Sequence, residues 1–146
     1  MHLEIHVEPG RAWTDLVLEP RFQGWDGIAH GGVLCTILDE VMAWSLVGED
    51  NWGLTARMNV EFKRPVVPGQ ALHADGAVTR VRRRLVETSG RIVDPADGTV
   101  LVTATAVYVA ADEARKRELR ERYGYVPRVS GPTAVDTPVV VEGTHG

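Results

Sequence analysis

Four residues in the first third of the chain have the types and spacing of a hydrolytic site. His30, Gly31 and Gly32 stand directly before an apolar stretch of helical period, and Asp39 follows nine residues after the histidine. A helix that starts with glycines exposes its first backbone N–H groups, which lack a partner in the helix and lie at the positive end of its dipole. Such a helix start suits an oxyanion or a polarised carbonyl. A continuous helix would bring Asp39 beside this place about two turns further on, so we predict a carbonyl-binding site next to a carboxylate.

Two neighbours of Asp39 offer alternative chemistry. Glu40 projects about 100° away from Asp39 on a helix, so the two carboxylates cannot face one carbonyl. Glu40 is therefore either the rival acid or an interfacial or solvated residue. Cys35 is the only cysteine, which excludes an intrachain disulfide, and its place in an apolar helix indicates a buried, inert thiol. Asp39 itself could be structural, but an aspartate among apolar residues in mid-helix is costly unless it is satisfied.

Composition limits the class of protein. The 146 residues are 44% hydrophobic and 25% charged with a net charge of −4, which favours one domain with no attraction to nucleic acid or anionic membranes. No long apolar run and no signal-peptide pattern is present, so we expect a cytoplasmic protein. The histidines lack metal-ligand spacing, and neither a phosphate-binding glycine loop nor a nucleophile elbow occurs. No metal is therefore expected.

A long helix and a following strand must position the site. The helix is predicted over 32–47 with Gly48 as its stop. It is apolar nearly all round, which indicates cover by a sheet and by a second subunit. The strand is predicted over 55–62, where apolar and polar residues alternate, as in a half-buried strand. One face is expected to carry Ala56, Met58, Val60 and Phe62, and the other Thr55, Arg57, Asn59 and Glu61.

The remaining segments complete an α+β domain. Strand patterns and one charged helix are separated by turn residues rich in proline, glycine and aspartate. We predict strands over 13–18, 72–81, 85–93 and 99–110, an ordered loop over 22–29, a hairpin turn over 94–98 and a helix over 111–123 ended by Gly124. Residues 1–123 are thus expected to form one domain, an antiparallel sheet of five to six strands wrapped around one long helix. Residues 124–146 are expected to be an extended or flexible tail.

Two segments resemble the signature of hotdog-fold acyl-CoA thioesterases of the PaaI-like type. The first is Phe22-Gln-Gly-Trp-Asp-Gly-Ile-Ala-His30-Gly-Gly-Val-Leu-Cys-Thr-Ile-Leu-Asp39-Glu40, and the second is Thr55-Ala-Arg-Met-Asn-Val-Glu-Phe-Lys-Arg-Pro-Val-Val-Pro-Gly69. The likeness covers residues 11–110. It implies a hotdog fold, hydrolysis of a small or medium acyl-CoA, and no cofactor beyond the coenzyme A of the substrate. It also implies a homodimer or a dimer of dimers with two equivalent sites at each dimer interface.

The resemblance implies roles for individual residues. Gly31 supplies the N–H that polarises the thioester carbonyl, with Gly32 beside it among the substrate-binding residues. Asp39, contributed by the partner subunit, acts as general base on water or as nucleophile. His30 orients the thioester or its neighbours, and Thr55 stands where relatives often place a hydroxyl that positions water.

One position departs from this pattern. Many relatives carry an asparagine or glutamine six residues before the histidine, where this chain has Gly24. Gln23 stands next to it. We therefore expect that Gln23 takes over this role or that water is positioned differently.

Two basic clusters could contact the phosphates of coenzyme A, which favour arginine forks. One is Lys63 and Arg64, and the other is the run of Arg82, Arg83 and Arg84. The alternative for the run is a solvated end of a hairpin. Both readings place the run between two strands.

Other functions on the same fold stay open. One is a hydratase or dehydratase of acyl thioesters, although the closely spaced aspartate and histidine expected there are absent; another is a non-catalytic acyl-CoA-binding module. Trp25 and Trp44 are interpreted as core or interface aromatics. Trp44, Leu46 and Met58 are candidates for lining an apolar acyl pocket, and the acyl group itself stays undefined.

Overall fold

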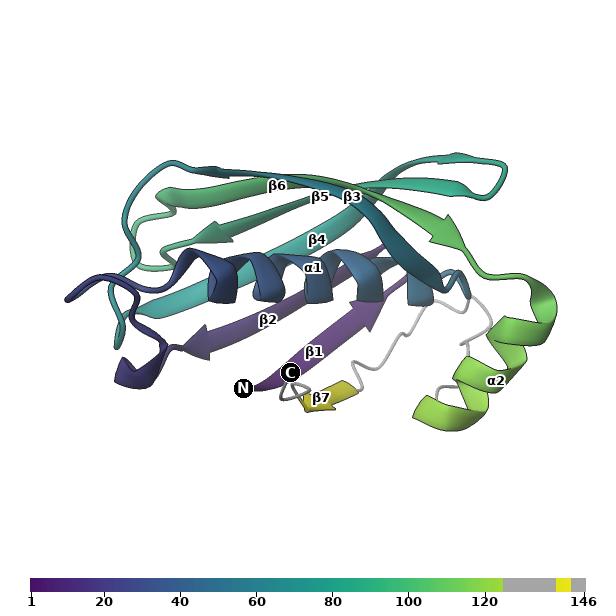
Figure 1. Ribbon diagram of the computed structural model, residues 1–146, viewed down its shortest axis with the longest axis horizontal. Helices are drawn as coiled ribbons and strands as arrows, with labels where there is room; N and C mark the ends of the chain where they lie inside the picture. Colours follow the sequence, from purple (N-terminus) through teal and green to yellow (C-terminus); the bar gives the residue numbers. More distant parts are fainter. Residues whose placement is uncertain (125–138, 143–146) are drawn as a thin grey trace.

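A curved sheet wrapped around one helix dominates the computed structural model, which describes residues 1–124 and 139–142 (Figure 1). Seven antiparallel strands lie in the order β3-β6-β5-β4-β2-β1-β7. The elements are β1 (His2–Glu8), β2 (Arg11–Val17), the short 3-10 helix η1 (Pro20–Phe22), α1 (Gly31–Val47), β3 (Gly53–Phe62), β4 (Ala71–Arg82), β5 (Leu85–Val93), β6 (Val100–Ala110), α2 (Glu113–Tyr123) and β7 (Val139–Glu142). The predicted hotdog α+β fold is confirmed, and each predicted helix and strand is present within two residues of its expected bounds.

The sheet is wider than predicted because it contains two further strands, β1 near the start of the chain and β7 near its end. β1 buries Leu3 and Ile5 in alternation with polar residues and pairs with β2. Its histidines and glutamates obscure the strand pattern in the sequence. β7 pairs with β1 from within the predicted tail, 124–146. The rest of that tail beyond Gly124, residues 125–138 and 143–146, lies outside the described residues.

A row of small residues across the sheet lets α1 lie directly on the strand backbones. Paired positions on four adjacent strands are Ala12, Gly76, Gly90 and Ala104. A Cβ built on Gly76 would lie 2.7 Å from backbone atoms of Val41 and Met42 in α1. No side chain fits there, so the glycine sets the distance between helix and sheet.

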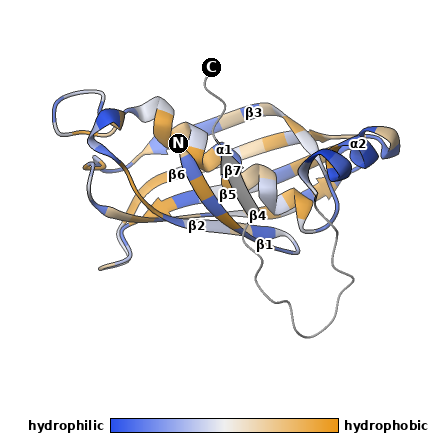
Figure 2. Cartoon of the chain, turned by 90° about the horizontal axis from the view of Figure 1, so that it is seen from below, coloured by the Kyte–Doolittle hydropathy of each residue, from blue (hydrophilic) through white to orange (hydrophobic). Residues whose placement is uncertain are grey.

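The buried apolar residues form one core cluster between α1 and the sheet. Along α2, by contrast, the chain is mostly hydrophilic (Figure 2). Fully buried α1 residues include Ile37, Leu38, Val41 and Met42. A second stripe of α1, with Thr36, Asp39, Glu40 and Ala43, is not fully covered. The predicted cover by a sheet is therefore confirmed on one side of the helix. Cover of the other side by a second subunit stays a prediction.

Gly48 ends α1, as predicted. Its backbone is helical, with φ −58° and ψ −26°. The left-handed residue is Asp50, with φ 57°. A Cβ on Gly48 would lie 1.9 Å from the carbonyl oxygen of Glu8, so the glycine is needed where the end of β1 crosses the helix end.

The C-terminal helix α2 is held against the domain by one ion pair and a group of aromatic rings. Arg120 Nε donates to Asp50 Oδ1 at 2.8 Å, and a second Arg120 nitrogen contacts the other oxygen of that carboxylate. The Tyr123 ring stacks on Trp52 with centroids 5.9 Å apart and meets Trp44 edge-on. The helix begins after the cap Asp112, two residues later than the predicted bound, and ends at the predicted Gly124, which has φ 61°.

Substitution of Gly76 tests the contact between helix and sheet, with Gly90 as a matched control on the neighbouring strand. Gly76→Ala places a methyl against helix backbone and is expected to lower the free energy of unfolding by about 1–3 kcal/mol. Gly90→Ala meets the flexible Met42 side chain at 3.0 Å and the Asp75 carbonyl oxygen at 3.3 Å, contacts less close than those at Gly76, and is expected to cost less. Urea unfolding of both variants checks this, and equal losses would contradict the role assigned to Gly76.

Candidate active site

The start of α1 leaves one backbone donor open. His30 is the N-cap, and its Nδ1 accepts a hydrogen bond of 2.9 Å from the Gly32 N–H. The N–H groups of Val33 and Leu34 donate to the His30 carbonyl. In the described part of the chain, no group accepts from the Gly31 N–H. Of the two glycines proposed for carbonyl binding, Gly31 therefore has the free donor.

The His30 side chain lies beside the Gly31 N–H, because it is bonded to the next N–H along the helix. Because Nδ1 accepts, the neutral ring carries its proton on Nε2, and the exposed imidazole is held against the helix start. A Cβ on Gly31 would lie 3.4 Å from Phe62 Cζ, so the open N–H borders an aromatic ring. A small acceptor approaching Gly31 would thus meet one hydrogen-bond donor beside an apolar wall.

Two hydroxyl groups converge on one oxygen of Asp39. Thr55 Oγ1 donates to Asp39 Oδ1 at 2.8 Å, and the Tyr108 hydroxyl lies 2.7 Å from the same oxygen. That hydroxyl is also 3.1 Å from the Asp39 carbonyl oxygen. None of the described residues donates to Oδ2. The carboxylate is therefore held in one orientation with its second oxygen open.

Tyr108 is a site residue that sequence reasoning missed. It is fully buried in a strand rich in valine, threonine and alanine. Burial, reinforced by the Asp39 carboxylate, raises the pKa of Tyr108 well above its ordinary value of 10.0, so the phenol stays a donor. The available signal was weak: a buried tyrosine needs a partner for its hydroxyl, but the sequence does not name that partner.

A β-bulge brings Thr55 to Asp39. Thr55 pairs with Tyr108 and Arg57 with Val107, which leaves Ala56 as an extra residue in β3. The strict alternation predicted for 55–62 would have put Thr55 on the outer face. The bulge instead places Thr55 on the inner face, together with Met58, because such an insertion re-aims the side chains before it.

The predicted burial of this strand was also partly wrong. β3 lies at the edge of the sheet, where Met58 and Val60 are half-buried while Ala56 and Phe62 are exposed. An edge strand has neighbours on one side only, so its apolar face is not closed within one chain. Leu54 is 79% exposed on the same strand.

The two predicted halves of the site do not meet within one chain. α1 is continuous from Gly31 to Val47. Eight residues of helical rise separate Gly31 from Asp39 by about 12 Å along the axis. The expectation that Asp39 lies beside the helix start of its own chain is therefore wrong.

Glu40 points away from the Asp39 cluster, as predicted from the helical wheel. Burial, and then the neighbouring Asp39 charge, raise the pKa of Glu40 above its ordinary value of 4.5, while a hydrogen bond with Trp44 opposes this shift. Cys35 is half-buried rather than buried, and burial raises the pKa of its thiol. Neither group contacts the Asp39 carboxylate through a hydrogen bond among the described contacts.

The loop before α1 is braced by its own hydrogen bonds. Gln23 Oε1 accepts from the Gly27 N–H at 3.3 Å, and the Gly24 N–H donates to the Ile28 carbonyl. The side-chain oxygen of Gln23 is thus hydrogen-bonded within the loop. The predicted role of Gln23 in positioning water stays a prediction. Trp25, expected in a core or interface, is 84% exposed at the loop tip, so it is not a core residue of this chain.

The basic residues proposed for phosphate contacts lie at opposite ends of the sheet. Arg64 follows β3, where Phe62 pairs with Val102 near the start of β6. Arg82, Arg83 and Arg84 form the β4–β5 turn, as predicted, next to the end of β6. Seven strand residues separate these ends by about 23 Å. Arg84 is engaged with the Ala110 carbonyl through Nε and Nη2, at 3.3 and 3.0 Å.

No group of three histidine, cysteine, aspartate or glutamate side chains that could hold a metal ion occurs among residues 1–124 and 139–142. Neither helix there has the length and apolarity that crossing a membrane requires.

The sequence model of the thioesterase superfamily matches residues 26–101, which include the α1 start, Asp39 and Thr55. The chain belongs to the thioesterase superfamily. Its sequence is 29% identical over 90 residues to acyl-coenzyme A thioesterase THEM4 of Xenopus laevis, a match that covers 62% of this chain and 40% of that protein. The chain thus spans less than half the length of this relative.

Solved structures of this superfamily share the fold. One thioesterase superfamily protein is 29% identical with a TM-score of 0.65, over 68% of this chain and 49% of that chain. A hypothetical thioesterase with coenzyme A from Streptococcus pneumoniae has a TM-score of 0.71 at 18% identity, over 75% of this chain and 88% of that chain. At this identity the second likeness shows the fold alone.

The raised pKa of Glu40 makes a prediction for stability against pH. Because folding disfavours the charged form, the wild type loses stability as pH rises above 4.5, where the unfolded carboxyl ionises, up to the raised folded value. Glu40→Gln removes this loss. We expect its urea midpoint to match that of the wild type at pH 4 and to exceed it at pH 8. A variant less stable than the wild type at pH 8 would show that the charged form is stabilised in the fold.

Proposed function

We propose that this protein hydrolyses acyl-CoA thioesters, with Asp39 as general base on the attacking water. The observation that carries the proposal is the Asp39 carboxylate, whose Oδ1 receives two hydroxyl donors while Oδ2 is open. Fixing one oxygen orients the other toward a water molecule. Superfamily membership and the likeness to an acyl-coenzyme A thioesterase support the choice of substrate.

The Gly31 N–H is the group proposed to polarise the thioester carbonyl. It is the open donor at the start of α1, where the helix dipole also favours developing negative charge. Water then adds to the carbonyl carbon and its proton passes to Asp39 Oδ2. The tetrahedral intermediate collapses with cleavage of the carbon–sulfur bond, and the proton returns to the leaving thiolate, so that free coenzyme A and a carboxylic acid are released.

The complete site is proposed to form between two chains. Gly31 and Asp39 of one chain are about 12 Å apart, which is too far for both to contact one carbonyl. In a two-fold symmetric dimer, the partner subunit's Gly31 can face Asp39, and two equivalent sites result. The half-covered stripe of α1 and the open edge of β3 are the surfaces left for such a partner.

Phosphate contacts are proposed for the basic residues at both ends of the sheet. Because Arg64 and the Arg82–Arg84 turn are far apart in one chain, a single coenzyme A would meet one cluster from each subunit or only one of them. A fold neighbour was solved with coenzyme A. The solvated reading of the Arg82–Arg84 turn stays the alternative.

Removal of the base tests the proposed chemistry. Asp39→Asn keeps the shape and the Oδ1 acceptor but loses the charge, so kcat should fall by roughly 10²–10⁴ in a free-thiol assay over a panel of acyl-CoAs. Tyr108→Phe removes one donor to Asp39 and is expected to give a smaller loss. Both variants must elute as folded oligomers like the wild type. An Asp39→Asn variant with near-normal turnover would remove Asp39 from the mechanism.

The same panel separates the other candidate functions. A hydratase or dehydratase would change the acyl chain without thiol release, as seen by mass spectrometry of the products. A binding module would return every acyl-CoA intact. Single turnover in ¹⁸O-water separates the two roles of Asp39. Label enters the Asp39 carboxylate only if Asp39 is the nucleophile, whereas a general base leaves the label in the released carboxylic acid.

Mixing two inactive variants tests the shared site. Gly31→Pro deletes the N–H at the first helical position, which proline suits, and His30 has the extended ψ of 128° that precedes proline well. Mixed with Asp39→Asn after joint refolding, it should restore roughly a quarter of wild-type activity, because half of random dimers hold one intact site. Absence of any recovery, with mixed dimers demonstrated, would place Gly31 and Asp39 outside a common site.

A further inference from the structure

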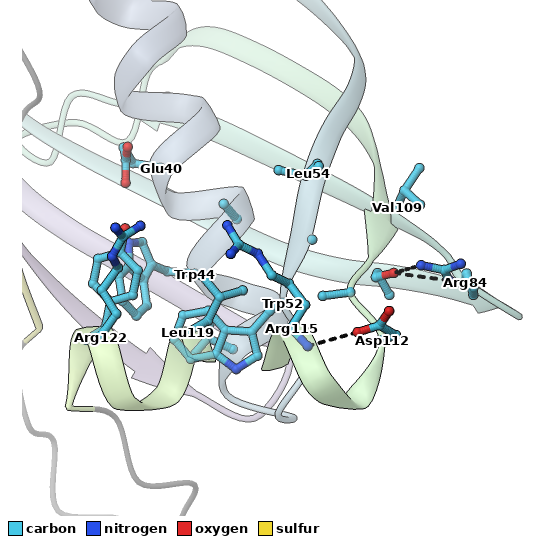
Figure 3. Close-up of a pocket in the computed structure, with 16 residues that line it drawn as sticks. Glu40, Trp44, Trp52, Leu54, Arg84, Val109, Asp112, Arg115, Leu119 and Arg122 are labelled. Carbon is cyan, nitrogen blue, oxygen red and sulfur yellow. Dashed lines mark hydrogen bonds between the residues drawn. The ribbon is translucent and has the colours of Figure 1, made fainter. Parts of the chain in front are cut away.

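A cavity beyond Asp39 is closed on one side by α2 (Figure 3). Its volume is about 490 Å³, within the range of small-molecule sites. The walls come from the second half of α1, the start of β3, the end of β6 and one face of α2. α2 lies outside residues 26–101, the part matched to the superfamily, so this wall belongs to the chain's own extension.

The cavity lies next to the Asp39 site, because neighbours of Asp39, Thr55 and Tyr108 line it on three elements, although these three residues do not. On α1, Ala43 lies one turn beyond Asp39 on the same face, about 6 Å further along the helix. On β3, Gly53 and Leu54 stand directly before Thr55, and on β6 two lining residues follow Tyr108. A group attached to a carbonyl carbon at Asp39 would reach this space by extending about one helical turn toward the C-terminal end of α1.

The lining is mainly apolar and aromatic. Trp44 and Trp52 form its floor with ring centroids 5.8 Å apart, and Tyr123 stacks on Trp52 from α2. Leu119 adds a half-buried aliphatic side chain from the same helix. Apolar surface of this extent gains free energy when an apolar group replaces water.

Five charged residues also line the cavity, namely Glu40, Arg84, Asp112, Arg115 and Arg122. Arg115 and Arg122 reach from α2 toward α1 (Figure 3). Arg115 pairs with Glu118 at 2.8 Å. Glu40 lies at the α1 wall, and its raised pKa is the effect expected of a carboxyl beside a desolvated space.

We infer that this cavity binds the acyl group of the substrate and that α2 sets the acyl size, which favours an apolar acyl body much larger than acetyl. The inference rests on the proposed thioesterase activity. Trp44, one of the three pocket candidates from the sequence, does line the cavity, whereas Leu46 is fully buried in the core and Met58 is not part of the lining.

Substitutions of Leu119 in opposite directions test this assignment. Thiol release is measured from acetyl-, octanoyl-, dodecanoyl- and benzoyl-CoA, and kcat/KM for each is divided by that for acetyl-CoA. Leu119→Trp fills the cavity and should lower the octanoyl and benzoyl ratios by roughly ten-fold or more. Leu119→Ala enlarges it and should raise the dodecanoyl ratio. Arg117→Trp and Arg117→Ala are matched controls on an exposed α2 position that does not line the cavity, and should leave all ratios unchanged.

The outcomes separate this inference from the proposed function. A wild type that favours octanoyl- or benzoyl-CoA, with ratios that shift oppositely in the two Leu119 variants, supports it, and the better of the two substrates shows whether the acyl body is aliphatic or aromatic. Activity with unchanged ratios in both folded Leu119 variants overturns the inference alone. A wild type that prefers acetyl-CoA also overturns it. No thiol release from any acyl-CoA overturns the proposed function and this inference with it.

Discussion

The contact of α1 with the backbone of β4 at Gly76 is the constraint on which the other features depend. A Cβ built on Gly76 would lie only 2.7 Å from backbone atoms of α1. If the helix moved away from the sheet or along it, it would lose this close contact with the row of small residues. This contact also fixes the rotation of α1 about its axis. Ile37, Leu38 and Val41 face the sheet, and Asp39 is consequently turned toward the side where β3 starts and β6 ends.

The carboxylate in this position is stabilised by long-range partners. Half-burying Asp39 next to an apolar core costs free energy that two hydroxyl donors offset. One donor comes from a buried tyrosine on a central strand, and the other from an edge strand that carries a bulge. The edge strand has a neighbour on one side only, so the Asp39 carboxylate lies next to an open surface of the protomer.

Three parts of α1 contribute different groups to this arrangement. Its start exposes a single N–H because His30 occupies the next one, its middle holds the carboxylate, and its last turns line the cavity under α2. A helix is rigid, so the spacing between these groups does not adjust to a ligand. The free N–H and the carboxylate can act on one molecule only when a second copy of the helix lies alongside.

The amino-acid sequence by itself determined the helix start at the glycines, the position of Asp39 within the helix, the bounds of β5 and the end of α2 at Gly124. These features follow from local rules: periodicity, N-capping and turn residues act over a few positions. The tertiary structure alone decided that Thr55 faces inward, that Tyr108 reaches Asp39 from 69 residues away, and that Gly48 ends its helix by close packing. Strand register and contacts between distant segments depend on how the whole sheet pairs and where the helix packs on it. A local sequence pattern therefore predicts neither the register nor these contacts.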